Sequence, residues 1–453
     1  MAFEHQPRFF GDLVNFVAEK AKAEHASFTT YISTENMLSS FGGVTTAATL
    51  PGSGSVTRFK TGDTLFSNIR TYFKKVWQAE FDGHCSNDVL VFRPKDETVL
   101  CSNYLHYLCR WEKFTEFSAR TSKDAKMPRG DKDALAQFQF ELPPIEEQIT
   151  MAGVLRRLDN KITVNRRINQ ALQAIGQAIF KSWFVDFDPV KAKIAAKQEG
   201  RDPLRAAMSA ISGTPDDELD ALPSEQYAQL AANAALFPDE MEESELGEIP
   251  RGWACGALGD ICSFTAGSAF KPEHQGSTEG DFPFIKVSDM NLAGNEVFIQ
   301  SANNYVSKSQ QSEMKAKLHP SGATVFAKIG VALISNRRRL LTAPTIIDNN
   351  LMSASPAEGK SGQYFLYSLL STLDFNTLVS GTALPYINVS DLKKIPIVRP
   401  PYDACHAFEA KASSFFSMMQ TLAAQSSTLA TTRDALLPKL LSGEIEASRT
   451  VEG

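Results

Sequence analysis

Gly62-Asp63-Thr64-Leu65-Phe66-Ser67-Asn68-Ile69 reappears later in the chain as Gly322-Ala323-Thr324-Val325-Phe326-Ala327-Lys328-Ile329, at an offset of 322 − 62 = 260. Shorter matches precede it: Gly11-Asp12-Leu13-Val14-Asn15-Phe16 resembles residues 259–264, and residues 31–37 resemble residues 284–290. Each copy closes on a Pro-Pro pair, at 143–144 and at 400–401, an offset of 400 − 143 = 257. Because the offsets agree within a few residues, we predict an internal repeat rather than chance similarity.

The segments within each copy are short and rich in β-branched and aromatic residues, and Gly, Asn, Asp and Pro bound them. Examples are residues 64–66, 89–92, 324–326 and 345–347. This pattern is typical of strands joined by turns. Each copy is therefore predicted to be a β-rich domain with a few short helices, such as one around residues 104–114.

After each Pro-Pro pair the periodicity changes to that of a long helix. Proline keeps the preceding residue extended, and Glu146 and Glu147 suit the positive end of a helix that begins at Ile145. Apolar and amide side chains then recur every seventh residue, which favours two helices coiling around each other. The predicted seam residues are Leu158, Ile162, Asn165, Leu172 and Ile179 in the first helix, and Phe408, Phe415, Leu422, Leu429 and Leu436 in the second.

The first long helix, from Ile145 to Phe184, is expected to span about 60 Å, which matches about 17 base pairs of DNA. Asn165 and Asn169 of the first helix and Gln425 of the second lie at polar seam positions and would fix the register of a helix pair. An alternative is that each helix packs only on its own domain. Between the halves, residues 186–250 are rich in Pro, Asp, Glu and Ala, and we expect a semi-flexible connector there.

Composition sets limits on function. With 453 residues, 43% hydrophobic and 22% charged, the chain has the composition of a soluble protein with two to four domains. There is no signal peptide or apolar run long enough to cross a membrane, so a cytoplasmic location is expected. The net charge of −6 argues against a uniformly basic protein, although local basic surfaces can still bind DNA. Six scattered cysteines with no Cys-x-x-Cys pair are expected to be free and buried.

Enzymatic motifs are incomplete. Neither Pro-Pro pair follows an Asn or Asp, as an amino-methyltransferase loop requires, because Leu142 and Arg399 stand there. Gly359-Lys360-Ser361 lacks the earlier glycine of a phosphate-binding loop, whose place Ala354 takes. No activating partner accompanies His84 and Cys85 in the sequence. We therefore expect no catalytic residue, no bound metal and no cofactor in this chain.

Several stretches resemble the specificity subunits of type I restriction-modification systems, over nearly the whole chain. They are Leu142-Pro143-Pro144-Ile145-Glu146-Glu147-Gln148, Leu158-Asp159-Asn160-Lys161-Ile162, Asn165-Arg166-Arg167-Ile168-Asn169, residues 180–189, residues 236–239, residues 245–253 and residues 436–445. The first copy differs in lacking the Ile249-Pro250-Arg251-Gly252-Trp253 preamble of the second.

The resemblance implies an α+β fold in which two β-rich target-recognition domains are separated by two long antiparallel coiled-coil helices, as a pseudo-twofold repeat. The implied segments are a first target-recognition domain (1–142), a first spacer helix (143–185), the connector (186–250), a second target-recognition domain (251–399) and a second spacer helix with a tail (400–453). The implied partners are double-stranded DNA, two methyltransferase subunits and restriction subunits. Those partners, rather than this chain, are expected to use S-adenosylmethionine, and ATP with Mg²⁺.

Basic residues fall at matched places in the repeat, just after the Gly-x-Thr-x-Phe segment. Such side chains can neutralise phosphates, and arginine can pair with guanine in the major groove. The candidate DNA-binding residues are Arg70, Lys74 and Lys75 in the first copy and Lys328, Arg337, Arg338 and Arg339 in the second, with Asn68, Tyr72 and Lys286 as weaker candidates.

The expected function is therefore a DNA reader for a two-part target, with half-sites spaced by roughly one to one and a half turns. Two alternatives stay open: a specificity module for another defence or modification enzyme, and a coiled-coil scaffold that binds only protein.

Overall fold

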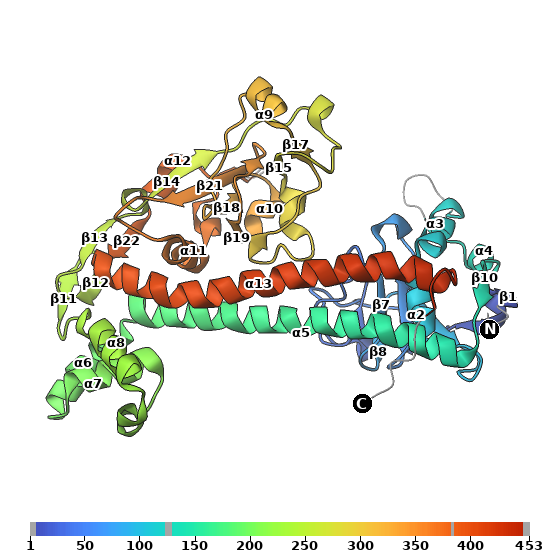
Figure 1. Cartoon of the computed structure of the whole chain (residues 1–453), viewed down its shortest axis with the longest axis horizontal. Helices are drawn as coiled ribbons and strands as arrows, with labels where there is room; N and C mark the ends of the chain where they lie inside the picture. Colours follow the sequence, from blue (N-terminus) through green and yellow to red (C-terminus); the bar gives the residue numbers. More distant parts are fainter. Residues whose placement is uncertain (1–5, 123–128, 382–384, 447–453) are drawn as a thin grey trace. The chain divides into compact units, whose positions relative to one another are not determined.

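The computed structural model describes residues 6–122, 129–381 and 385–446 (Figure 1). It divides into two compact units. The first unit comprises the chain up to Thr163 together with the chain from Ser427 onward, and the second unit comprises Val164–Ser426. No helix in the described ranges combines the length and apolarity needed to cross a membrane.

The first unit holds the first β-rich domain. Its strands form a two-stranded ribbon and two four-stranded sheets, in the orders β1-β10, β2-β9-β6-β7 and β3-β5-β8-β4. The strands are β1 (Gln6–Phe9), β2 (Val14–Phe16), β3 (Lys20–Lys22), β4 (Tyr31–Ile32), β5 (Ser55–Phe59), β6 (Thr64–Ser67), β7 (Val76–Gln78), β8 (Gly83–Cys85), β9 (Val89–Pro94) and β10 (Gln139–Leu142). The helices are α1 (Phe10–Leu13), the 3-10 turns η1 (Ala23–His25) and η2 (Thr71–Phe73), α2 (Ser102–Arg110), α3 (Glu112–Arg120) and α4 (Lys132–Ala136).

Aromatic side chains fill the core of the first unit. Phe10, Phe66, Phe92 and Phe114 are all buried, and neighbouring rings in this group meet mostly edge to face. Such pairs stabilise a core beyond their buried area. They hold β6 and β9 against α3.

The second unit holds the second β-rich domain, with sheets in the orders β13-β22, β14-β21-β18-β19-β16 and β17-β15-β20. The strands are β13 (Ala254–Ala257), β14 (Cys262–Ala266), β15 (Phe282–Ile285), β16 (Phe298–Ile299), β17 (Tyr305–Val306), β18 (Thr324–Ala327), β19 (Arg338–Leu341), β20 (Ile346–Ile347), β21 (Leu351–Pro356) and β22 (Pro396–Arg399). The helices are the 3-10 segments η4 (Leu258–Asp260), η5 (Pro272–His274), η6 (Val287–Asn291) and η7 (Phe375–Leu378), with α9 (Lys308–Met314), α10 (Val331–Ile334), α11 (Gln363–Thr372) and α12 (Val389–Lys393).

The two domains repeat each other strand by strand, so the predicted α+β repeat is confirmed. The ribbon β1-β10 corresponds to β13-β22, and the run β2-β9-β6-β7 corresponds to β14-β21-β18-β19. The parallel pair β4-β8 corresponds to the parallel pair β15-β20. The quoted repeat, residues 62–69 and 322–329, contains the central strands β6 and β18.

Two helices of 40 residues follow the ribbons: α5 (Ile145–Phe184) and α13 (Tyr402–Leu441). The first begins and ends at the predicted residues. Within the second unit the helices contact each other in antiparallel order, since Asn165 Nδ2 donates to Gln425 Oε1 (2.8 Å) while Phe180 meets Phe408 (5.4 Å between ring centroids). Within the first unit Asp159 of α5 pairs with Arg433 of α13.

The predicted seam residues of α5 are partly buried or buried. Ile162 and Asn165 are buried, and Leu158, Leu172 and Ile179 are half-buried. The two asparagines of the seam donate across to α13, Asn165 to side chains and Asn169 Nδ2 to the main-chain oxygen of Met419 (3.0 Å).

The most buried row of α13 differs from the predicted one. Phe408 is buried, but Phe415, Leu422, Leu429 and Leu436 are only half-buried. A neighbouring row at the same seven-residue interval lies deeper: Cys405, Ala412, Met419, Ser426, Arg433 and Leu440. Several of these side chains are small, and the bond from Asn169 to a main-chain oxygen requires a close approach to the α13 backbone. Phe415, Leu422, Leu429 and Leu436 therefore flank the contact instead of forming its centre.

The connector is folded, which corrects the expectation of a semi-flexible segment. It contains α6 (Asp188–Gln198), α7 (Pro203–Ser212), the 3-10 helix η3 (Asp216–Ala221), α8 (Ser224–Ala235) and a hairpin of β11 (Met241–Ser244) and β12 (Gly247–Pro250). Figure 1 shows α6, α7 and α8 gathered beyond the end of α5.

Three prolines of the connector start helices instead of interrupting them. Pro189 and Pro203 lie in the first turns of α6 and α7, and Pro223 caps α8. Proline is favoured there because its missing N–H would have no partner in a helix start. Trp183 of α5 meets the buried Phe237, and this aromatic contact anchors the segment in the core of the second unit.

Candidate nucleic-acid interface

The predicted basic residues surround one turn in each domain. The first turn, residues 70–74, joins β6 to β7, and the second turn, residues 330–336, joins β18 to β19. Residues with positive φ bracket both turns: φ is 49° at Arg70 and 52° at Lys74, and it is 81° at Gly330 and 53° at Asn336. The left-handed region costs a residue other than glycine roughly 1–2 kcal/mol. Both copies therefore place residues with positive φ at this turn, although the backbone differs in detail, because ψ is 57° at Arg70 and −174° at Gly330.

Main-chain hydrogen bonds hold the first turn in this shape. Within the turn, Phe73 N donates to Arg70 O and Lys74 N donates to Thr71 O, both at 2.9 Å. From the neighbouring loop, Ser40 N donates to Phe73 O and Phe41 N donates to Lys74 O, also at 2.9 Å. The side chains of the turn therefore project from a fixed backbone.

Three of the predicted residues of the first domain are presented at the surface. Arg70 and Tyr72 are exposed, and Lys74 is half-exposed beside Glu112, with 3.1 Å between Nζ and Oε1. Lys75 instead points inward, since its Nζ donates to the main-chain oxygen of Thr34 (2.6 Å) and burial lowers its pKa. Asn68 is half-buried under the turn.

In the second domain Arg337 is exposed and Lys328 is half-buried. Lys286 lies elsewhere, at the end of β15, where its ammonium group is 5.1 Å from the ring centroid of Phe270 and donates to Gln275. The structure therefore brings Lys328 and Arg337 to the second turn and leaves Lys286 apart from it in sequence and contacts.

Arg338 is a structural residue, which corrects its prediction as a DNA contact. Its side chain is buried, and its guanidinium lies 3.8 Å from the ring centroid of Phe375. It donates to Asn336 Oδ1 (2.8 Å) and to the main-chain oxygen of Leu373 (3.0 Å). Burial lowers its pKa to about 10, which leaves it charged at neutral pH. Arg338 thus fixes the left-handed Asn336 from inside the domain.

Arg339 is likewise occupied inside the domain. It donates to the main-chain oxygens of Met290 (3.1 Å from Nη2) and Arg338 (2.8 Å from Nη1). Burial lowers its pKa as well. Of the three consecutive arginines, only Arg337 is directed at solvent.

Replacing each of two neighbouring arginines with alanine distinguishes a structural role from a role in DNA binding. Arg338→Ala is expected to lower the free energy of unfolding of the second unit by about 2–4 kcal/mol, because buried acceptors lose their donor and the contact with Phe375 is lost. Arg337→Ala is expected to change it by less than about 0.5 kcal/mol and to weaken duplex binding. Chemical denaturation and duplex titration measure the two effects. If Arg338→Ala kept full stability while losing DNA binding, Arg338 would be a DNA contact after all.

Sequence reasoning named Tyr72 as a candidate but missed the exposed apolar residues Phe73 and Ile334. Tyr72 is 55% exposed and Phe73 39%, and Ile334 in the second turn is 54% exposed. Tyr386 is also exposed and forms an isolated antiparallel β-bridge with Ile329. In the first domain Arg129 forms the corresponding β-bridge with Ile69. A sequence does not show directly which side chains are exposed, but the repeat match ends at Ile69 and Ile329, immediately before the two turns.

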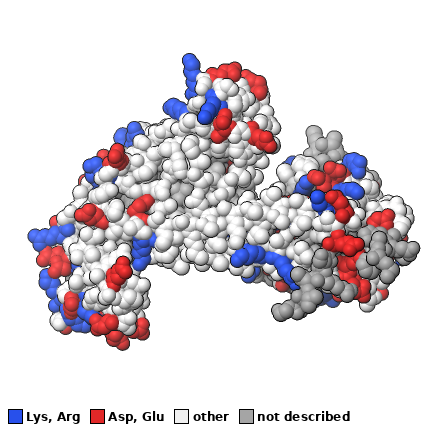
Figure 2. Space-filling view, viewed as in Figure 1, with Lys and Arg blue, Asp and Glu red and all other residues white. Residues whose placement is uncertain are grey.

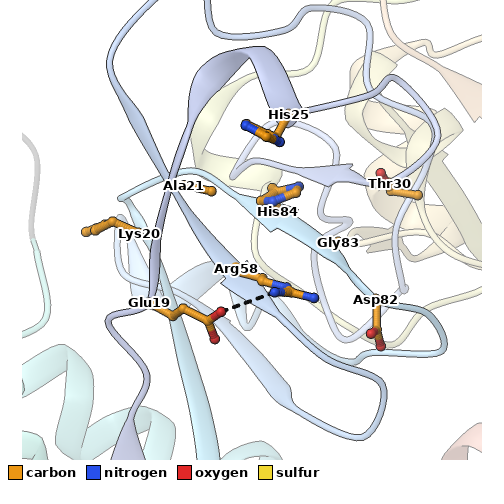
Figure 3. Close-up of a pocket in the computed structure, with 9 residues that line it drawn as sticks. All are labelled: Glu19, Lys20, Ala21, His25, Thr30, Arg58, Asp82, Gly83 and His84. Atoms are coloured by element: carbon orange, nitrogen blue, oxygen red, sulfur yellow. Dashed lines mark hydrogen bonds and ion pairs between the residues drawn. The ribbon is translucent and has the colours of Figure 1, made fainter.

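A pocket of about 470 Å³ lies on the sheet β3-β5-β8-β4 of the first domain (Figure 3). His25 and His84 line it, with 6.2 Å between their ring centroids, and burial together with His25 lowers the pKa of His84. Glu19 pairs with Arg58 across it (3.3 Å). The charges of the pocket are mixed, so it favours neither an anion nor a cation.

The cysteines carry no evident chemistry. All six are free, and four of them are buried: Cys85, Cys109, Cys262 and Cys405. Burial raises the pKa of Cys85 to about 12, so this thiol stays protonated and unreactive at neutral pH. In the described part of the chain, no three His, Cys, Asp or Glu residues are grouped to hold a metal ion.

Comparison with known proteins gives the same division into two copies. The model of the family "Type I restriction modification DNA specificity domain" matches twice, at residues 8–174 and 250–414. The chain is 32% identical over 417 residues to the type I restriction enzyme HindI specificity subunit of Haemophilus influenzae, covering 87% of this chain and 89% of that protein. It is 27% identical over 354 residues to the MjaIX specificity subunit of Methanocaldococcus jannaschii, covering 78% and 70%.

Among solved structures, the S subunit of a type I restriction-modification system from M. genitalium aligns at a TM-score of 0.49 and 13% identity, covering 97% of this chain and 96% of that one. The two family matches span most of the sequence, and each contains one domain with the start of its long helix. The chain therefore belongs to the family of type I restriction-modification DNA specificity subunits.

Proposed function

We propose that this chain reads a two-part DNA sequence, one part with each repeated domain, and brings that target to the subunits that modify and cleave DNA. The observation that carries the proposal is the double match to a DNA specificity domain, together with an exposed arginine at the turn between corresponding strands in both copies. Two similar readers in one chain suit a target with two separate halves.

The candidate contacts are the surface cations of the two turns. Arg70 and Lys74 would serve the first half-site, and Lys328 and Arg337 the second. An exposed arginine can bind a phosphate or pair with guanine in the major groove. Figure 2 shows acidic and basic side chains interspersed over the visible face, without one dominant basic field. Binding by this chain alone is therefore expected to be weak, with partner subunits adding phosphate contacts.

The long helices would hold the partner subunits. Between Lys411 and Arg433, α13 has no charged residue, and neither has α5 between Arg167 and Lys181. Met418 is 50% exposed and Ile175 46% exposed on these helices. Depletion of charge with exposed apolar side chains is typical of the centre of a protein interface. We assign this surface to two methyltransferase subunits, which would use S-adenosylmethionine. Restriction subunits, using ATP with Mg²⁺, would join the same assembly, and this chain would do no covalent chemistry.

Footprinting of the assembled complex tests the proposal. On the target found by sequencing the methylated genome of the host, two clusters of protected bases are expected, separated by bases without contacts. A single contiguous cluster would contradict a two-part reader. Two other classes of function make different predictions: a module for another enzyme would co-purify with different partners, and a protein-only scaffold would show no salt-sensitive duplex binding.

A further inference from the structure

The turns between β6 and β7 and between β18 and β19 expose apolar side chains where a DNA reader is expected to expose polar ones. Tyr72 and Phe73 are consecutive and exposed together, with 4.7 Å between their ring centroids. Neither ring is needed by the core, because the buried residue of this turn is Thr71. Exposing two neighbouring aromatic rings to water is unfavourable, so a ligand that covers them would gain their burial.

The second domain repeats this arrangement with different residues. Ile334 is the last residue of α10, is 54% exposed, and lies two residues before the left-handed Asn336. In the first turn Phe73 directly precedes the left-handed Lys74. The two domains thus expose an apolar side chain at the turn between corresponding strands, although the residues and the local backbone differ.

Hydrogen bonds hold the backbone of both turns that carry the exposed apolar side chains, which we call the apolar tips. Two hydrogen bonds from the loop at Ser40 and Phe41 hold the first turn, and the buried Arg338 holds the second through Asn336. Main-chain hydrogen bonds therefore hold the turn in the first domain, and an arginine side chain holds the corresponding turn in the second. A side chain that must push between other groups needs such support, because a flexible turn would yield instead.

The charge beside the tips identifies the class of ligand. Arg70 directly precedes the first turn's helical residues, and Arg337 directly follows Asn336 in the second, and both are exposed. Cations next to an apolar tip suit a ligand with an anionic exterior and an apolar interior. Duplex DNA has this layout, with phosphates outside and stacked bases inside.

We propose that Tyr72 and Phe73 in the first domain, and Ile334 in the second, are wedges that enter the base stack at one step of each half-site. This inference rests on the proposed function and adds how each half-site is engaged. Side chains of these types unstack base steps in other DNA-binding proteins, whereas reading base edges by hydrogen bonds requires donors or acceptors that Phe73 and Ile334 lack. Sequence preference would follow, because pyrimidine-purine steps open more easily than others.

The test uses the full chain assembled with its methyltransferase subunits and target duplexes that carry 2-aminopurine at successive positions, leaving out the base that becomes methylated. The fluorescence of this base rises when it loses its stacking partners. With the unchanged chain, a rise is expected at one step in each half-site. The double variant Tyr72→Ser with Phe73→Ser should lose the rise in the first half-site only, and Ile334→Ser should lose it in the second only.

Affinity should fall roughly tenfold to hundredfold in either variant, which corresponds to the loss of one or two base–aromatic contacts in the first half-site and of one buried aliphatic side chain in the second. Phe73→Leu should retain the signal, because leucine also serves as a wedge. Phe28→Ser is the matched control, since Phe28 is a similarly exposed aromatic residue (52%) in another loop of the first domain, and it should change neither signal nor affinity.

The outcomes separate the two proposals. Specific binding without a fluorescence rise at any tested step would overturn the wedge and leave the two-part reader standing. A rise that survives in both serine variants would also overturn the wedge. Absence of any sequence-specific binding by the assembled complex would overturn the proposed function, and the wedge with it.

Discussion

Replacing Asp159 with asparagine is expected to lower the free energy of unfolding of the first unit by about 3–5 kcal/mol. Asp159 lies on α5, and its carboxylate accepts from three partners: Tyr107 Oη (2.7 Å), Arg110 Nη1 (2.7 Å) and Arg433 Nη1 (2.6 Å). Both arginines are almost fully buried. An amide in place of the carboxylate leaves the buried Arg110 without its counter-charge and Arg433 with only the exposed Asp434, and this accounts for the size of the effect.

The contacts of Asp159 join separate parts of the first unit. Tyr107 and Arg110 belong to α2 of the β-rich domain, and Arg433 belongs to α13. One carboxylate therefore fixes the domain to both long helices where they belong to this unit. The variant should accordingly also loosen the domain, with faster hydrogen exchange in α2 as the measurable sign.

Asp434→Asn is the matched control. Asp434 also pairs with Arg433 (2.7 Å), but its side chain is 57% exposed. Its loss should cost less than about 1 kcal/mol, because water takes over the contact. Chemical denaturation of both variants gives the comparison. Equal and small effects would show that the buried charges rearrange without cost, and would refute the assigned role of Asp159.

Acid should have the same effect as the substitution. Burial by itself raises the pKa of Asp159, but Arg110 and Arg433 outweigh it and hold this pKa below the ordinary value. A lowered carboxylate pKa contributes stability that is present above the unfolded pKa of about 3.9 and is lost as the pH falls below it. The stability of the unchanged protein should therefore fall more steeply below pH 4 than that of the asparagine variant.

Deletion of one heptad from each long helix is expected to move the preferred spacing of the two half-sites. Removing residues 166–172 from α5 and residues 417–423 from α13 keeps the antiparallel register, because the deleted segments face each other around the bond from Asn169 to Met419. Seven residues of helix are about 10 Å, equivalent to about 3 base pairs. On a series of targets with different spacers, the optimum should shorten by about 3 base pairs.

The original target should be bound at least about a hundredfold more weakly by this variant, because each domain's binding energy then depends on the other domain reaching its half-site. The two half-sites also rotate relative to each other by roughly a third of a turn per 3 base pairs, so the whole spacer series must be measured. The control replaces the same residues with a different heptad of equal length. An unchanged optimum after the deletion would refute the helices as the measure of spacing.

The overall architecture could be predicted from the sequence because the repeat and the seven-residue spacing are periodic patterns. The bounds of α5 followed from Pro143-Pro144 and the seven-residue spacing, and the strand order of the second domain followed the first. The prediction of a semi-flexible connector was wrong because proline breaks a helix in its interior but is favoured in its first turn. Only the burial of residues such as Phe237 shows which of the two effects applies. The innermost row of α13 was misjudged because two neighbouring rows share the same period.

The candidate site was predicted less completely than the fold. Three consecutive arginines look alike in a sequence, yet Arg337 faces water while Arg338 is enclosed beneath Phe375 and Asn336. Their difference arises from the packing of α10 and the 3-10 helix η7, which are far apart in the chain. Exposure of Phe73 and Ile334 is equally a tertiary property, since elsewhere such residues fill cores.

The ribbons β1-β10 and β13-β22 pair the first strand of each domain with its last strand, so the chain enters and leaves each domain at adjacent positions. Gln6 pairs with Leu142 at one end of the first domain, and Ala254 pairs with Arg399 at the ends of the second. A polypeptide segment whose entry and exit are adjacent can be exchanged for a foreign one without stretching its host. New recognition sequences are therefore accessible by grafting one domain at its ribbon, while the rest of the molecule and the partners it holds stay the same.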